Sequence, residues 1–159
     1  MKALLQRVSH ASVSFNGEVI GTIGQGFAIL LGVAQGDTKK DAEYLAKKVV
    51  NLRVFEDQQG KFNLSALDVK GELLVVSQFT LLASTKKGHR PSFTEAAPPE
   101  EAEPLFDLFV ELLRGSGLSV VKGLFRQHLL VEIHNDGPVT ILLDTREQKG
   151  QEFRCHCEE

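Results

Sequence analysis

The chain has 159 residues, of which 42% are hydrophobic and 25% charged, and its formal net charge is −3. This length allows one domain with a hydrophobic core, and the composition excludes general disorder. The negative balance excludes loose coating of nucleic acid, which needs a strong positive field, but it permits local contact with one end of an RNA. Because no apolar stretch approaches ~20 residues and the cysteines form no disulfide framework, we expect a cytoplasmic protein.

The first third of the chain is predicted to form strands. Residues 4–8 and 12–15 lead into Asn16-Gly17, a dipeptide that favours a hairpin turn, and residues 18–23 supply the returning strand. The run GFAILLGVA, residues 26–34, is apolar on both faces, which is typical of a buried central strand.

Residues 36–55 change to a helical period. Asp37 or Thr38 can cap this helix, the latter with Asp41 three positions on. The lysines of the segment fall mostly off its apolar stripe and are interpreted as a solvated face. The apolar stripe consists of Ala42, Leu45, Ala46 and Val49.

The second half is predicted as a turn at 56–62, a strand at 71–83 and a loop at 84–99. A helix then begins near Pro99 or Glu100, buries Leu105, Phe109 and Leu112, and ends at residues 115–117. Three strands follow at 118–121, 129–134 and 139–144. We therefore predict one α/β domain over residues 1–145, with a mixed sheet or partial barrel, and a polar tail at 146–159.

Polar residues interrupt the apolar strand predicted for 71–83. Both faces of this strand are otherwise apolar, so Ser77, Gln78 and Thr80 would enter a dry environment in which polar groups need partners. They either bond to neighbouring backbone and end the strand, or they line a functional site.

The 84–99 loop is the second candidate site. Lys86, Lys87, His89 and Arg90 precede Phe93, and positive side chains with a stacking ring suit a phosphate and a base at a single-stranded RNA end. The alternative is a solvated basic loop, although loops of this length in a compact domain are often functional.

The sequence gives less support to a zinc site or to a known catalytic or nucleotide-binding motif. Cys155, His156 and Cys157 could offer three zinc ligands, but no second Cys or His pair has zinc-finger spacing, so we predict a tail without metal. No nucleophile elbow, Walker loop or dinucleotide fingerprint is present.

Near the C-terminus, Asp136-Gly137-Pro138 breaks a run of β-branched and aliphatic residues. Proline cannot donate to a sheet ladder, and glycine serves where the backbone needs unusual torsions or a close approach. From the residues alone, a hairpin turn is the simplest interpretation.

Three stretches together resemble the D-aminoacyl-tRNA deacylase family, also known as D-tyrosyl-tRNA deacylases. These are MKALLQRVSHASV at the start, SQFTL in the middle and NDGPVT near the end, in that order, and the similarity runs from residue 1 to about 145. The resemblance implies two sheets with helices on one side. It also implies a homodimeric editing hydrolase, without a cofactor, that cleaves the ester between a D-amino acid and the 3′ end of a tRNA.

The resemblance also implies roles for individual residues. Ser77, Gln78, Phe79 and Thr80 would line the catalytic pocket. Gly137 and Pro138 would form a cis-peptide motif that enters the partner subunit's pocket, and Arg7 would hold that motif. Lys86, Lys87, Arg90 and Phe93 would bind the RNA, with Phe93 near the terminal adenosine.

The resemblance has two consequences, and two other interpretations compete with it. Backbone oxygens of the Gly-Pro motif would exclude an L side chain, so glycyl-tRNA would be cleaved as well. Catalysis would use either the tRNA's ribose hydroxyl, with backbone N–H groups around Gln78 and Phe79 as the oxyanion hole, or Thr80. The rival interpretations are a non-catalytic RNA-end or nucleotide-binding module and a zinc-dependent regulator that uses the tail.

Overall fold

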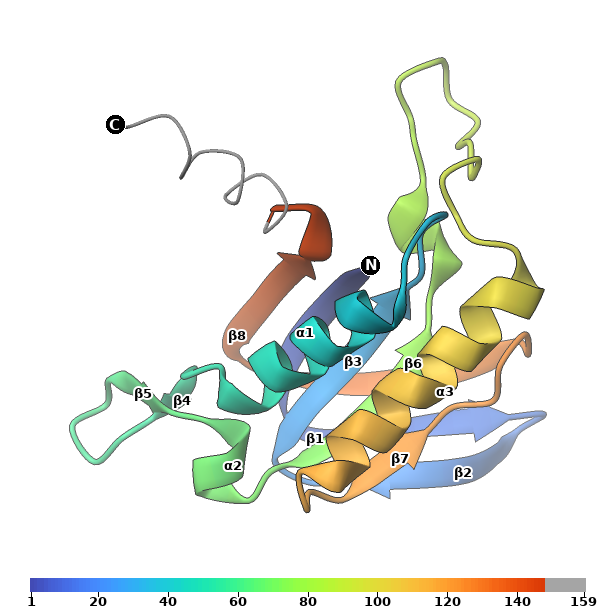
Figure 1. Cartoon of the computed structure of the whole chain (residues 1–159). Helices are drawn as coiled ribbons and strands as arrows, with labels where there is room; N and C mark the ends of the chain where they lie inside the picture. Colours follow the sequence, from blue (N-terminus) through green and yellow to red (C-terminus); the bar gives the residue numbers. More distant parts are fainter. Residues whose placement is uncertain (148–159) are drawn as a thin grey trace, which may run out of the picture.

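The computed structural model describes residues 1–147 and shows a mixed sheet with its two longer helices on one face (Figure 1). The six-stranded sheet has the order β2-β1-β3-β6-β7, and β8 pairs with the free side of β1. The predicted single α/β domain with a partial barrel is confirmed. Its strands are β1 (Lys2–Phe15), β2 (Glu18–Ile23), β3 (Gly26–Gly32), β6 (Glu72–Ser77), β7 (Val120–Lys122) and β8 (Leu129–Asp144).

The long strand β1 pairs with three other strands of the partial barrel. Its first half pairs with β3 and its second half with β2, while β8 runs antiparallel along both halves. By contrast, β3, β6 and β7 are parallel neighbours. The β1–β2 turn has φ values of 50° at Asn16 and 81° at Gly17, so the predicted hairpin is confirmed.

The predicted first helix is α1 (Lys39–Asn51), and Thr38 is its N-cap with a capping box to Asp41. Its apolar stripe is buried as expected. The second helix, α3 (Pro99–Gly115), begins and ends where predicted. Phe109 is fully buried, but Leu105 and Leu112 are only half-buried because the centre of the buried face is Ala102, Phe106, Phe109 and Leu113.

The strand predicted for 71–83 is wrong beyond Ser77. β6 ends there, and residues Phe79–Leu82 form the short 3₁₀ helix η1. Leu82 is fully buried and packs where a side chain at Gly32 would otherwise lie, so the apolar pattern reflects burial of a turn rather than a longer strand. The expectation that Gln78 and Thr80 are strand residues is therefore wrong.

Two other differences concern the strands. The strands predicted at 129–134 and 139–144 form the single strand β8, because pairing with β1 resumes beyond the Asp136-Gly137-Pro138 interruption. The predicted turn at 56–62 is flanked by a small hairpin, β4 (Phe55–Glu56) and β5 (Phe62–Leu64), which the short helix α2 (Ala66–Val69) follows. None of the helices in the described residues is long and apolar enough to cross a membrane.

The sheet face opposite α1 and α3 is only partly covered. Near the start of β1 and the end of β8, Leu4 pairs with Leu142 on one side and with Leu30 on the other. The three side chains therefore form a row across neighbouring strands. Leu4 and Leu30 are half-buried, and Leu142 is 53% exposed. Val76 of β6 continues the row beside Leu30. We call Leu4, Leu30 and Leu142 the apolar row.

Candidate active site

A pocket of about 800 Å³ opens where β6 ends. Its walls come from the β6–η1 junction, the segment that leads into α3, and the connection between β7 and β8. The lining is mixed, with aromatic and aliphatic side chains around a few polar groups, as is usual for a small-ligand site. It consists of Val33, Val76, Ser77, Gln78, Phe79, Phe93, Ala96, Ala97, Pro99, Ala102, Leu124, Phe125, Arg126, Gln127, His128, Leu129 and Val131.

Three of the four residues predicted to be catalytic line this pocket. Ser77 ends β6 opposite Leu31, and the N–H of Gln78 then donates to the carbonyl of Leu31 at 2.7 Å. The chain turns into η1 at this point, which directs Phe79 to the pocket with 56% of its surface exposed. Thr80 does not line the pocket, and its hydroxyl accepts a hydrogen bond from the Gln78 side chain.

The backbone geometry changes the set of available oxyanion donors. Because the N–H of Gln78 is bonded to Leu31, this group cannot serve as we expected. The first N–H groups of a helix have no partner within the helix. The backbone N–H groups of Phe79 and Thr80 begin η1 and donate to no group within the described part of the chain.

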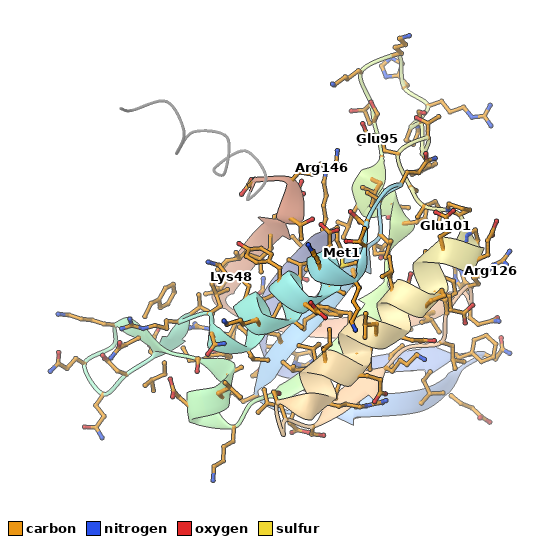
Figure 2. The ribbon with its side chains drawn as sticks, viewed as in Figure 1. Met1, Lys48, Glu95, Glu101, Arg126 and Arg146 are labelled. Carbon is orange, nitrogen blue, oxygen red and sulfur yellow. The ribbon has the colours of Figure 1, made fainter. Side chains whose placement is uncertain are left out.

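Phe93 reaches the same pocket from the long loop. Its ring centroid lies 5.0 Å from that of Phe79 in an edge-to-face arrangement. The base of the loop is anchored, since the N–H of Ala97 donates to Val33 at 3.0 Å and Arg146 lies 3.4 Å from Glu95 (Figure 2).

The tip of this loop carries the predicted cations away from the pocket. The loop projects well beyond the sheet in Figure 1. Lys86, Lys87 and Arg90 are exposed there and do not line the pocket. The structure therefore separates the aromatic member of the predicted RNA-binding set from its three cations.

One wall of the pocket was missed by the sequence reasoning. The connection between β7 and β8 contributes Arg126, Gln127 and His128, all exposed. Arg126 has φ of 60°, a left-handed conformation that is uncommon for a residue other than glycine. Figure 2 shows Arg126 beside the first turn of α3, where Glu101 is labelled. The only available signal was a polar, basic stretch between two predicted strands.

Gly137 and Pro138 lie within β8 and do not line this pocket. Both are exposed, and the peptide bond between them is cis, as predicted. The side chain of Asn135 accepts a hydrogen bond from the N–H of Val139 at 3.2 Å, which links the two ends of the segment. Asn135 to Val139 is called the Gly-Pro tip below.

Arg7 anchors the Gly-Pro tip from β1. Its side chain is buried, and its Nε donates to the carbonyl of Asp136 at 3.1 Å. The expectation that Arg7 packs near this motif is therefore confirmed. Within residues 1–147 there is no group of three or more His, Cys, Asp or Glu side chains placed to hold a metal ion. The Cys155-His156-Cys157 sequence lies outside the described residues.

The sequence matches known proteins over almost its whole length. A family model described as D-Tyr-tRNA(Tyr) deacylase matches residues 4–144. A D-aminoacyl-tRNA deacylase of Dehalococcoides mccartyi is 60% identical over 148 residues, which cover 93% of this chain and 97% of that protein. One from Thermomicrobium roseum is 57% identical over 150 residues, covering 94% and 97%.

Two solved structures share the fold. One, described as "c-Myc DNA Unwinding Element Binding Protein", is 46% identical with a TM-score of 0.85 and covers 91% of this chain and 98% of its own. The other, described as "Structural Analysis of a probable eukaryotic D-amino acid tRNA deacylase", has a TM-score of 0.77, 15% identity and coverages of 90% and 98%. At this identity the second likeness concerns the fold alone.

Proposed function

The chain belongs to the D-Tyr-tRNA(Tyr) deacylase family and is a hydrolase of D-aminoacyl-tRNA esters, and from this we propose that hydrolysis takes place in the pocket at the end of β6. The observation that carries the proposal is the position of the SQFTL stretch. Ser77, Gln78 and Phe79 line a cavity of about 800 Å³, large enough for a nucleoside and an amino acid.

The aromatic pair at this pocket is suited to the terminal adenosine of the tRNA. Bases in single-stranded RNA are bound by stacking on aromatic side chains, and both Phe79 and Phe93 line the pocket. Lys86, Lys87 and Arg90 then contact phosphates farther along the acceptor end, because they extend from the same loop as Phe93.

The Gly-Pro tip acts in the pocket of a second subunit. Gly137 and Pro138 are exposed and lie outside their own chain's pocket, and the apolar row leaves an open face that runs to Val76 at the pocket wall. A homodimer that covers this row places each tip at the other subunit's pocket. Its backbone oxygens then exclude the side chain of an L-amino acid.

Catalysis relies on the substrate's own ribose hydroxyl to orient the attacking water. Backbone N–H groups of η1, at Phe79 and Thr80, stabilise the oxyanion that forms on the ester carbonyl. Within residues 1–147 the hydroxyl of Thr80 has no hydrogen-bonded base, because its partner is the Gln78 side-chain amide, which donates to it. We therefore do not assign Thr80 as the nucleophile.

The test is release of D-tyrosine from D-tyrosyl-tRNA, measured beside L-tyrosyl-tRNA in the presence of EDTA. We expect rapid cleavage of the D-ester alone. Thr80→Ala should retain activity, whereas Phe79→Ala should lose it. A substrate esterified at the 3′ position of a terminal 2′-deoxyadenosine should resist cleavage. Binding without turnover would instead favour an RNA-end binding module.

Exclusion by backbone oxygens makes a specific prediction for glycine. Glycine has hydrogen at both α-positions, so it presents nothing to exclude, and the missing methyl contacts are worth only about 1–3 kcal/mol. Glycyl-tRNA and D-alanyl-tRNA should both be cleaved, while L-alanyl-tRNA survives, when the three are compared at equal enzyme concentration. Inert glycyl-tRNA would mean that the enzyme recognises the D side chain directly.

A further inference from the structure

The small β4–β5 hairpin contacts the residue that anchors the Gly-Pro tip, although it contributes nothing to the pocket. The carbonyl of Val54, one residue before β4, accepts a hydrogen bond from Nη1 of Arg7 at 2.8 Å. The ring of Phe62 in β5 lies against the guanidinium, with Cζ of Arg7 5.4 Å from the ring centroid. One side chain therefore joins two segments that are distant in the sequence.

The same guanidinium contacts the Gly-Pro tip on its other side. Nε donates to the carbonyl of Asp136 at 3.1 Å, and the Asp136 carboxylate is 3.5 Å away. Nη2 lies 3.2 Å from the point where a Cβ on Gly137 would be. Arg7 is 5% exposed. Any rotation of this side chain would thus change the support beneath Gly137.

Phe62 is 53% exposed, so burial of apolar surface explains its position poorly. A ring over one face of a guanidinium is favourable by cation–π attraction and limits motion of the group out of its plane. The Glu56 carboxylate is 3.8 Å from Nη2 and is exposed, so it contributes little by comparison.

We propose that Phe62 is a positioning residue for stereochemical discrimination. Its ring holds the Arg7 guanidinium, and Arg7 in turn holds the Gly-Pro tip at the place where it meets the substrate. The β4–β5 hairpin is then part of the selectivity apparatus without touching substrate. This inference rests on the proposed function of the tip.

The test compares three variants with the wild type. Phe62→Leu keeps apolar bulk but removes the ring, Phe62→Tyr keeps the ring, and Lys61→Ala is a matched control at the adjacent exposed position. The readout is the ratio of kcat/KM for D-alanyl-tRNA to that for L-alanyl-tRNA, with the midpoint of thermal unfolding measured in parallel. Phe62→Leu should lower this ratio about three- to tenfold with little change in the midpoint. Phe62→Tyr should keep the ratio of the wild type.

An unchanged ratio in Phe62→Leu would overturn the inference. So would a fall of the ratio in Phe62→Tyr or Lys61→Ala as large as the fall in Phe62→Leu. A Pro138→Ala variant separates this from failure of the proposed function. If Pro138→Ala lowers the ratio while Phe62→Leu does not, the tip discriminates and Phe62 is not needed. If neither variant changes the ratio, the proposed role of the tip is itself wrong.

Discussion

Gly137 is the position where the Gly-Pro tip leaves no room for a side chain. Its φ is 129°, which L-residues rarely adopt. A Cβ there would lie 2.8 Å from Cγ2 of Val139 and 3.0 Å from its backbone nitrogen. Conformation and packing both require glycine, so a substitution has to move either the tip or Arg7.

We therefore expect Gly137→Ala to destabilise the fold by about 1–3 kcal/mol and to lose discrimination between D- and L-alanyl-tRNA. Gly17→Ala is the matched control, because Gly17 has φ of 81° but nothing within 4 Å of its added Cβ. It should cost stability and leave selectivity intact. Denaturant unfolding and the two deacylation rates check both variants, and equal selectivity in the two would contradict the proposed role of the tip.

At the scale of elements, regular periodicity was sufficient to predict α1, α3 and the β1–β2 hairpin. Ala42, Leu45, Ala46 and Val49 repeat at helical spacing, and Asn16-Gly17 has the torsions that its turn requires. Each of these signals is local, so it can be interpreted without knowing the rest of the fold.

The misplaced elements depend on contacts that are distant in the sequence. Leu81 and Leu82 continue the apolar run of β6, and only the packing of Leu82 against Gly32 shows that the chain has already turned. In the candidate site, the polar interruption of the apolar run indicated Ser77 and Gln78, and the ring in the basic loop indicated Phe93. The resemblance of the SQFTL stretch added Phe79. Arg126 was missed because nothing local to residues 124–128 indicates that this connection faces the β6 terminus.

The turn of the β4–β5 hairpin gives a prediction about pH. The N–H groups of Lys61 and Gln59 donate to the carboxylate of Asp57, which lowers the pKa of this group from 3.8. A lowered pKa means that the ionised carboxylate stabilises the folded hairpin above pH 3.8 and that this contribution is lost as pH falls through the folded-state value.

Asp57→Asn should therefore reduce the free energy of unfolding at neutral pH, and its difference from the wild type should shrink as the pH falls below 3.8. Unfolding by denaturant at a series of pH values measures this difference. Gln58→Ala, in the same turn, should show no such convergence. A difference for Asp57→Asn that stays constant with pH would exclude the charge as its source.

At the scale of the whole molecule, our proposal requires two subunits to complete each site. The Gly-Pro tip does not line the pocket of its own chain, and the apolar row lies on the partly covered face of the sheet. Leu142 is the most exposed member of the row, so a charge there should oppose association strongly.

We expect Leu142→Arg to sediment as a monomer, to keep its fold by circular dichroism and to lose deacylase activity. Leu67→Arg is the control, because Leu67 is exposed on α2, away from the apolar row. It should remain dimeric and active. A fully active Leu142→Arg monomer in sedimentation coupled to the assay would show that one subunit is sufficient.

The pairing of β1 with β8 also orders events during synthesis. β1 leaves the ribosome before the other strands of the sheet, but Phe15 pairs with Leu129 and Lys2 with Asp144, so its partner β8 emerges only after the rest of the sheet. Until then one side of β1 has unpaired backbone groups, an edge open to chaperones or to strands of other chains. Leu129 and Val131 of β8 also line the pocket, so a nascent chain has no complete pocket. The proposed pocket of an enzyme that edits aminoacyl-tRNA is therefore complete only after translation has passed residue 131.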